Sequence, residues 1–273
     1  MATTLEQKLE ATVKTSPKIS RRSKMNGTVI YFTPSKVASA GSFAPFRMTP
    51  LAPTVVLIHN MWGNHRILHR HVQLFNELGF NCVTFNLYRA SSIKDSHPFG
   101  FFKKFQFMHR VWVEQVQDVL DSVEGQKIIF AMSGPAIAGI IAGSQRTDVT
   151  HLICDSGPFK EVWQCTYRLL TQIWHIPTAP LRALFTTVSV FLWGPTAFRR
   201  SQKALKKWNR NVPILSIRGT LDPLVFAKNI DGIFKDHSDL NIKFWTIANA
   251  HHLDGLKLFP DAYKKEIMSF LLS

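Results

Sequence analysis

Three polar residues of types that together can activate a hydroxyl group each follow an apolar run of the sequence. Ser133 follows KIIFAM, Asp222 follows PILSIRGTL, and His251 follows KFWTIANA. A histidine can take the proton of a serine hydroxyl as that hydroxyl attacks a carbonyl carbon, and a carboxylate can orient the histidine and stabilise its cation. The residue types therefore predict nucleophilic attack on an acyl group, provided that the fold brings them together.

Alternatives stand beside these residues. His252 is a competing base next to His251, and the spacing from the preceding apolar run favours His251. Asp155 follows the run HLIC and is a competing acid, although it can also simply begin an Asp-Ser-Gly-Pro turn. Ser133 itself can belong to a Ser-Gly-Pro turn that has no chemistry.

Short apolar runs alternate with segments of helical period from residue 54 onward. We expect strands at 54–59, 81–85, 127–132, 151–154, 213–217 and 243–247, and helices at 64–78, 111–123, 135–144, 224–234 and 262–272. Runs that are apolar throughout are typical of strands buried on both faces, and helices between them predict parallel connections. The sequence thus predicts an α/β fold with a doubly wound, mostly parallel sheet. Two early segments, 28–32 and 46–49, are candidates for an antiparallel edge.

The expected domain organisation follows from this alternation. Residues 1–25 form a basic tail without the apolar stretch of a secretory signal, and residues 26–158 form the first part of the core. Residues 159–210 interrupt the alternation for longer than an ordinary connection, which predicts a helical lid or cap insertion. Residues 211–273 complete the core. In a parallel sheet, ligand chemistry gathers at the carboxyl ends of the strands, where the three polar residues stand.

The segments after the predicted strands resemble those of the α/β-hydrolase superfamily, in its esterase and lipase-like serine hydrolases. The resemblance extends over nearly all of residues 28–272 and includes the chain order Ser, Asp, His. Ala131-Met132-Ser133-Gly134-Pro135 resembles the family's Gly-x-Ser-x-Gly turn, with Ala and Pro in place of the outer glycines. Proline suits the first turn of a helix, which is where this one would stand. Gly219-Thr220-Leu221-Asp222-Pro223 resembles the family's acid loop.

The resemblance implies roles for individual residues. Ser133 would be the nucleophile, His251 the base and Asp222 the acid of a catalytic triad. The backbone N–H groups of Gly134 and Met61 would form the oxyanion hole. Together these groups would cleave an ester or thioester through an acyl-enzyme.

The loop after the first parallel strand departs from the family's His-Gly, because it reads His59-Asn60. Asparagine tolerates a left-handed backbone better than other residues with a side chain, so we expect Asn60 in that conformation. We expect His59 to be structural, hydrogen-bonding the loop. The expected substrate pocket is lined by Trp62, Trp174 and Phe191. The apolar insertion favours a small-molecule substrate with a hydrophobic acyl group.

We expect no cofactor and no metal. His65, His69 and His71 form a cluster, but Arg66 and Arg70 would repel a cation, so a solvated helix face is expected there. The alternative to an enzyme is a catalytically silent, hydrolase-like binding or scaffold protein. This alternative stays open because the serine turn and the His-Asn loop both depart from the family pattern.

The charge suggests partners beyond a small molecule. The chain of 273 residues has 33 Lys and Arg against 18 Asp and Glu, a net charge of +15, with six basic residues between 199 and 210. We do not expect nucleic acid as a partner, because no recognised binding motif or aromatic-basic repeat accompanies the charge. An apolar lid beside a basic helix can dock on an anionic membrane, and the alternative is a solvated basic face.

Three cysteines are too few for a disulfide framework, so we expect reduced core residues at Cys82 and Cys154. No transmembrane helix is expected. The sequence therefore predicts a cytoplasmic protein, with a peripheral position at a membrane surface as the further option.

Overall fold

One sheet of seven strands organises the part of the chain that the computed structural model describes, residues 29–32, 52–88 and 107–273. The strand order is β1-β3-β2-β4-β5-β6-β7, with β1 antiparallel to β3 and the other pairs parallel. The strands are β1 (Val29–Phe32), β2 (Thr54–Ile58), β3 (Cys82–Phe85), β4 (Lys127–Met132), β5 (Val149–Asp155), β6 (Ile214–Gly219) and β7 (Ile242–Ile247). The predicted parallel sheet with an antiparallel edge at 28–32 is confirmed. The expected strand at 46–49 and the tail at 1–25 lie outside the described residues.

Apolar runs form the central strands because both faces of the sheet are covered. Every residue of β2 (TVVLI) and of β4 (KIIFAM) is buried. The register pairs Ile58 with Ala131 and Met132 with Asp155, so β2, β4 and β5 end at the same edge of the sheet. The segments that follow these strands therefore lie close together.

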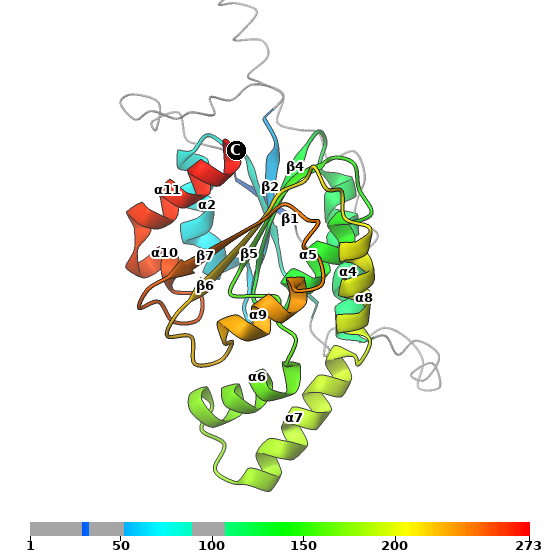
Figure 1. The fold of residues 1–273 in the computed structure, drawn as a ribbon, viewed down its shortest axis with the longest axis vertical. Coiled ribbons are helices and arrows are strands. Elements are labelled where there is room, and N and C mark those ends of the chain that lie inside the picture. The colour runs from blue at the N-terminus through cyan, green and yellow to red at the C-terminus, as the bar shows by residue number, and fades with distance from the viewer. Residues whose placement is uncertain (1–28, 33–51, 89–106) are drawn as a thin grey trace, which may run out of the picture.

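Helices cover both faces of this sheet (Figure 1). They are α2 (His69–Glu77), preceded by the 3₁₀ turn η2 (His65–Leu68), α4 (Met108–Ser122), α5 (Ala136–Gly143), α8 (Ala197–Lys206), α9 (Ala227–Phe234), α10 (Gly255–Leu258) and α11 (Pro260–Leu271). One apolar cluster joins the sheet to α2, α10 and α11, and a second joins the other face to α4, α5, α8 and α9. The result is a three-layer arrangement with a core on each side of the sheet.

The chain between β5 and β6 forms additional helices. These are α6 (Val162–Arg168), the π-helical turn η4 (Leu169–Ile173), α7 (Ala179–Trp193) and α8. Helices α6 and α7 project from the sheet, whereas α8 packs against α5 (Figure 1). We call residues 162–193, which comprise α6, η4 and α7, the helical hairpin. A role of residues 159–210 as a lid stays a prediction.

The cysteines Cys82, Cys154 and Cys165 are all buried and carry free thiols. The expected core positions of Cys82 and Cys154 are therefore confirmed. None of the helices in the described ranges is long and apolar enough to cross a membrane.

Candidate active site

Ser133 lies in the sharp turn between β4 and α5, and its backbone has a left-handed φ of 53°. A residue with a side chain rarely adopts this conformation, so surrounding contacts must hold it. The Ser133 N–H donates to the Asp155 carbonyl at 2.8 Å, and the Ala136 N–H donates to the Ser133 carbonyl at 3.1 Å. The segment after β5 lies against the serine turn. Only glycine fits at position 157, because a Cβ there would lie 2.2 Å from the Ser133 carbonyl oxygen.

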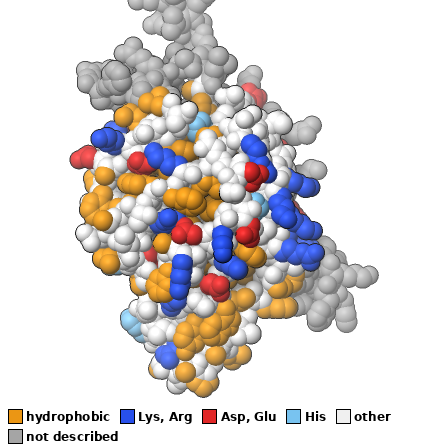
Figure 2. All heavy atoms as spheres, viewed as in Figure 1, with side chains coloured by type: hydrophobic (Ala, Val, Ile, Leu, Met, Phe, Trp, Pro, Cys, Tyr) orange, Lys and Arg blue, Asp and Glu red, His pale blue; other side chains and the backbone are white. Residues whose placement is uncertain are grey.

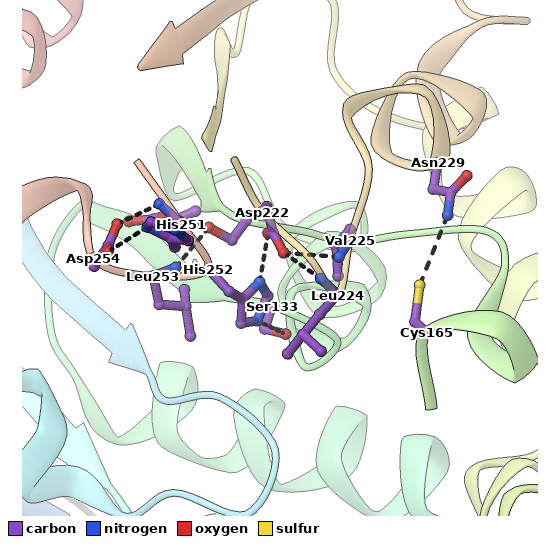
Figure 3. Close-up of polar contacts among 12 residues, drawn as sticks. Ser133, Cys165, Asp222, Leu224, Val225, Asn229, His251, His252, Leu253 and Asp254 are labelled. Atoms are coloured by element: carbon purple, nitrogen blue, oxygen red, sulfur yellow. Dashed lines mark hydrogen bonds and ion pairs between the residues drawn. The ribbon is translucent and has the colours of Figure 1, made fainter. Parts of the chain in front are cut away.

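The serine hydroxyl, an imidazole and a carboxylate lie in sequence at this turn (Figure 3). Ser133 Oγ is 3.1 Å from His252 Nε2, and His252 Nδ1 is 2.7 Å from Asp222 Oδ2. A carboxylate only accepts hydrogen bonds, so Nδ1 carries the ring proton and Nε2 offers its lone pair to the hydroxyl. This arrangement can remove the hydroxyl proton as the oxygen attacks an acyl carbon.

The loop after β6 holds Asp222 in a fixed orientation. The backbone N–H groups of Leu224 and Val225 both donate to Asp222 Oδ1 at 2.8 Å. These two bonds leave Oδ2 for His252, and the carboxylate is almost entirely buried. Backbone donors thus fix the acid before any substrate is present, as preorganisation of a site requires.

The structure places His252, and not the predicted His251, against Ser133 and Asp222. The side chain of His251 points away and is 56% exposed. Its backbone N–H donates to Asp254 Oδ1 at 2.7 Å, and its Nδ1 lies 3.4 Å from Asp254 Oδ2. The choice of His251 as the base is therefore corrected to the neighbouring histidine, which was the alternative.

The conformation of the loop after β7 explains this correction. The strand ends at Ile247, and both Asn249 (φ 61°) and Leu253 (φ 63°) then adopt left-handed backbone conformations. Each such residue redirects the chain, so spacing counted along an extended strand does not apply. The redirected loop turns His252 inward and His251 toward solvent.

Asp155, the competing acid, accepts no hydrogen bond from His252, whose Nδ1 contacts Asp222 instead. Its carboxyl group is buried and accepts hydrogen bonds from Tyr263 Oη at 2.6 Å and from Ser156 Oγ at 2.9 Å. Burial raises the pKa of Asp155. The Ser156 hydroxyl oxygen in turn accepts the N–H of Leu253 at 3.2 Å. Asp155 therefore connects through Ser156 to the loop that carries His252.

The loop after β2 carries the other predicted oxyanion donor. Among the described residues, no backbone acceptor takes the N–H of Met61 or of Gly134. The loop turns through a bond from the Gly63 N–H to the Asn60 carbonyl at 3.2 Å, and its left-handed residue is Trp62, with φ 70°. The expectation that Asn60 takes the left-handed position is therefore wrong.

His59 is structural, as expected. Its Nδ1 donates to the Asn60 carbonyl at 2.7 Å, and its Nε2 accepts the N–H of Leu87 at 2.9 Å. These bonds join the loop after β2 to the segment after β3. His59 thereby supports the loop that presents Met61.

Aromatic residues of the helical hairpin approach this loop and the serine turn. Trp62 and Trp174 pack edge to face, with ring centroids 5.6 Å apart. Phe191 packs instead against Phe107, with centroids 5.8 Å apart, and its side chain is largely exposed. The ring that covers the serine turn is Trp193, because a Cβ on Gly134 would lie 2.9 Å from its Cη2 atom.

Trp193 was missed as a site residue in the sequence, where it is one apolar residue among many. The signal for it is helical spacing. It stands seven residues after Thr186, and both residues are buried on α7. Cys165 of α6 adds a second link between the hairpin and the body, since its sulfur accepts Nδ2 of Asn229 at 3.8 Å (Figure 3).

The histidines of the predicted solvated cluster have different surroundings. His69 is exposed, and His65 Nδ1 lies 3.0 Å from Asn86 Oδ1. His71 is buried beside Phe130, with ring centroids 4.8 Å apart, so the expectation of a solvated face is wrong for this residue. Burial lowers the pKa of His71 to about 3.

Comparisons with known proteins find similarity at the level of the fold. No protein-family model and no curated protein matches the chain. Among solved structures, the esterase Pf2001 of Pyrococcus furiosus is 17% identical, with 81% of this chain and 83% of that chain covered and a TM-score of 0.58.

Two further structures are similar over most of both chains. Est1E from Butyrivibrio proteoclasticus is 14% identical, with 90% of this chain and 95% of that one covered and a TM-score of 0.57. The monoacylglycerol lipase of Paleococcus ferrophilus is 13% identical, with 90% and 100% covered and a TM-score of 0.55. Together with the sheet topology, these similarities show that this chain has the α/β-hydrolase fold.

Proposed function

We propose that the protein is a serine hydrolase that cleaves an ester or thioester with a hydrophobic acyl group through Ser133, His252 and Asp222. The observation that carries the proposal is the pair of contacts at His252, 3.1 Å to the serine hydroxyl and 2.7 Å to the carboxylate. The similar solved structures, which include esterases and a monoacylglycerol lipase, support hydrolysis of an ester as the reaction class.

The proposed reaction has two stages. Ser133 Oγ attacks the acyl carbon while His252 takes its proton, and the negative charge on the acyl oxygen is held by the N–H groups of Met61 and Gly134. The bond to the leaving oxygen or sulfur then breaks, and His252 protonates that leaving group. A water molecule deprotonated by His252 attacks the acyl-enzyme, releases the carboxylic acid and restores Ser133.

The surroundings of the serine support an apolar acyl group. Trp62 and Trp174 form an aromatic wall beside the loop of Met61, and Trp193 covers the start of α5. Aromatic walls of this kind bind acyl chains by removing apolar surface from water. In this proposal the helical hairpin is the lid, and Phe191, which packs on Phe107, is not part of the aromatic wall.

A covalent probe tests the proposal directly. A fluorophosphonate should label the wild type and should leave Ser133→Ala unlabelled, because the probe reacts with an activated serine hydroxyl. A series of esters of increasing acyl length should then show turnover by the wild type alone. Labelling that persists in Ser133→Ala would reject this nucleophile. A folded wild type without labelling or turnover would favour the silent scaffold.

A further inference from the structure

Helix α7 presents an apolar stripe to solvent. Five large side chains on it are between 38% and 58% exposed, namely Leu181, Leu184, Phe185, Val188 and Phe191. Successive members are three, one, three and three residues apart, which places all five on one face of the helix. The opposite face carries the buried residues Thr186 and Trp193. The stripe is therefore the solvent-exposed side of α7, and at its end Phe191 also packs on Phe107.

The rest of the hairpin extends this apolar surface. Trp163, Ile173 and Trp174 are also exposed, so the hairpin holds eight of the fifteen large exposed hydrophobic side chains in the described part of the chain. Figure 2 shows hydrophobic side chains gathered on the projecting part of the molecule. A contiguous patch of this kind marks an interaction surface in a folded protein.

The segment that contains the hairpin and α8 carries charge of one sign along the sequence, although Arg210 at its end pairs with Asp239. Residues 162–210 contain eight Lys and Arg and no Asp or Glu. On α8, which follows α7 after a short turn, Arg199, Lys203 and Lys206 are exposed, and Lys207 continues the exposed basic run beyond the helix. Lys and Arg side chains line the edge of the molecule where α8 lies (Figure 2).

We infer that the helical hairpin and α8 dock on the surface of a bilayer that carries anionic phospholipids. A bilayer offers both an apolar layer for the stripe and negative headgroups for the basic residues. A second copy of this chain is a less suitable partner, because its basic residues would repel those of the first copy. Nucleic acid would satisfy the charge but would leave the apolar stripe without a partner.

This docked orientation also involves the proposed active site, and that part rests on the proposed function. Trp174 belongs to the exposed apolar set, and its ring packs on Trp62, next to Met61. The apolar surface therefore reaches the loop of the proposed oxyanion donor. A hydrophobic acyl substrate held in the bilayer would meet the protein at this end.

Vesicle binding of the full-length chain tests the inference without using activity. Ser133→Ala protein is sedimented with vesicles of phosphatidylcholine alone or of phosphatidylcholine mixed with phosphatidylserine. We expect binding to the mixed vesicles that is about 30-fold weaker in Lys203→Gln with Lys206→Gln, since each basic residue near an anionic surface contributes about 1 kcal/mol. Leu184→Asp with Val188→Asp should weaken binding about tenfold or more, because both side chains would leave the apolar layer.

The matched control lies on α10, where Lys257 and Leu258 are exposed at a distance from the hairpin (Figure 1). Lys257→Gln with Leu258→Asp should bind mixed vesicles as the parent does. An equal loss in this control would overturn the inference, and so would absence of binding to mixed vesicles or equal binding to phosphatidylcholine alone. A dimer that Leu184→Asp dissociates, or an RNA complex in place of vesicle binding, would overturn it too.

Wild-type protein, tested with the same vesicles and with the fluorophosphonate, separates the two proposals. Wild-type protein that takes the fluorophosphonate but does not bind mixed vesicles would reject docking alone. Protein that binds mixed vesicles but is not labelled would reject the hydrolase and leave docking intact. Unfolding in urea verifies that each variant is folded. We expect every variant to fold, because the substituted side chains are exposed.

Discussion

His251 and His252 are adjacent in the chain but have different surroundings, which makes them a matched pair for testing the site. His252→Ala should lower kcat/KM for an ester by about 10⁴-fold or more, because the base and its orienting contact to Asp222 are lost together. His251→Ala should change kcat/KM by less than about threefold, since this side chain contacts Asp254 and solvent. Steady-state kinetics of both variants decide the assignment, and the reverse order of effects would restore His251 as the base.

Ser156 is a candidate positioning residue for His252. Its hydroxyl donates to Asp155 and accepts the N–H of Leu253, and its φ of 55° suits glycine. Ser156→Gly should therefore lower kcat about tenfold with KM nearly unchanged, because the loop loses its anchor without backbone strain. Tyr263→Phe is the control, since it removes the other hydroxyl from the same carboxylate at 2.6 Å.

Ser156→Gly and Tyr263→Phe should affect different quantities. Tyr263→Phe should lower the free energy of unfolding and leave kcat near the wild-type value. A fall in kcat of equal size in both variants would show a general loss of structure instead of positioning through Ser156. Rates of fluorophosphonate labelling provide a second measure of how well the loop presents His252.

At the scale of elements, the contact between α7 and the serine turn couples the helical hairpin to the body. A Cβ at Gly134 would lie 2.9 Å from Cη2 and 3.4 Å from Cζ3 of Trp193. Gly134→Ala should therefore displace the ring and destabilise the protein by about 1–3 kcal/mol. Trp193→Phe should relieve that clash, so the double variant should lose less stability than the two single losses summed.

Urea unfolding of the two single variants and the double variant measures this coupling. Strict additivity would show that the ring does not respond to the added methyl group. Gly125 is the contrasting position, because its φ is 74° and a Cβ there meets nothing within 4 Å, whereas Gly134 has no left-handed φ. Gly125→Ala should reveal the effect of left-handed backbone strain alone.

The elements themselves are largely predictable from the sequence, and their ends are not. β2 and β4 are buried on both faces, so a continuous apolar run identifies each of them. The loop of His252 depends on left-handed conformations at Asn249 and Leu253, which hydrophobic patterning does not encode. Helical spacing indicates that Trp193 lies on the buried side of α7, but it does not reveal that the partner of this ring is the serine turn, which is a long-range contact.

At the scale of the whole molecule, His71 makes stability depend on pH. Its folded pKa of about 3 lies below the unfolded value of 6.5, so the unfolded chain binds more protons between these values. The free energy of unfolding contributed by this group is therefore complete above pH 6.5 and is lost as the pH falls toward 3, by up to about 1.4 kcal/mol per pH unit. Neither ring nitrogen has a hydrogen-bond partner among the described residues.

His71→Leu should remove this dependence. It should unfold at a similar urea concentration to the wild type at pH 8 and at a higher one below about pH 5, since a buried polar group without a partner is replaced by an apolar one. Asp155 Oδ2 lies 4.0 Å from His71 Nε2, and its raised pKa acts in the opposite direction at acid pH, so the same comparison made with Asp155→Asn in both proteins separates the two contributions. Parallel loss of stability in both proteins from pH 6.5 downward would assign the effect to other groups.

The burial of all three native thiols allows a single label to be attached at a chosen position. Because Cys82, Cys154 and Cys165 are all buried, a maleimide that stays in water has no ready target on the folded chain. A single cysteine introduced by Val188→Cys on the exposed face of α7 would then carry the only fluorophore or nitroxide. The same substitution made in turn at the other exposed positions of the stripe would measure immersion depth residue by residue, without first removing any native cysteine.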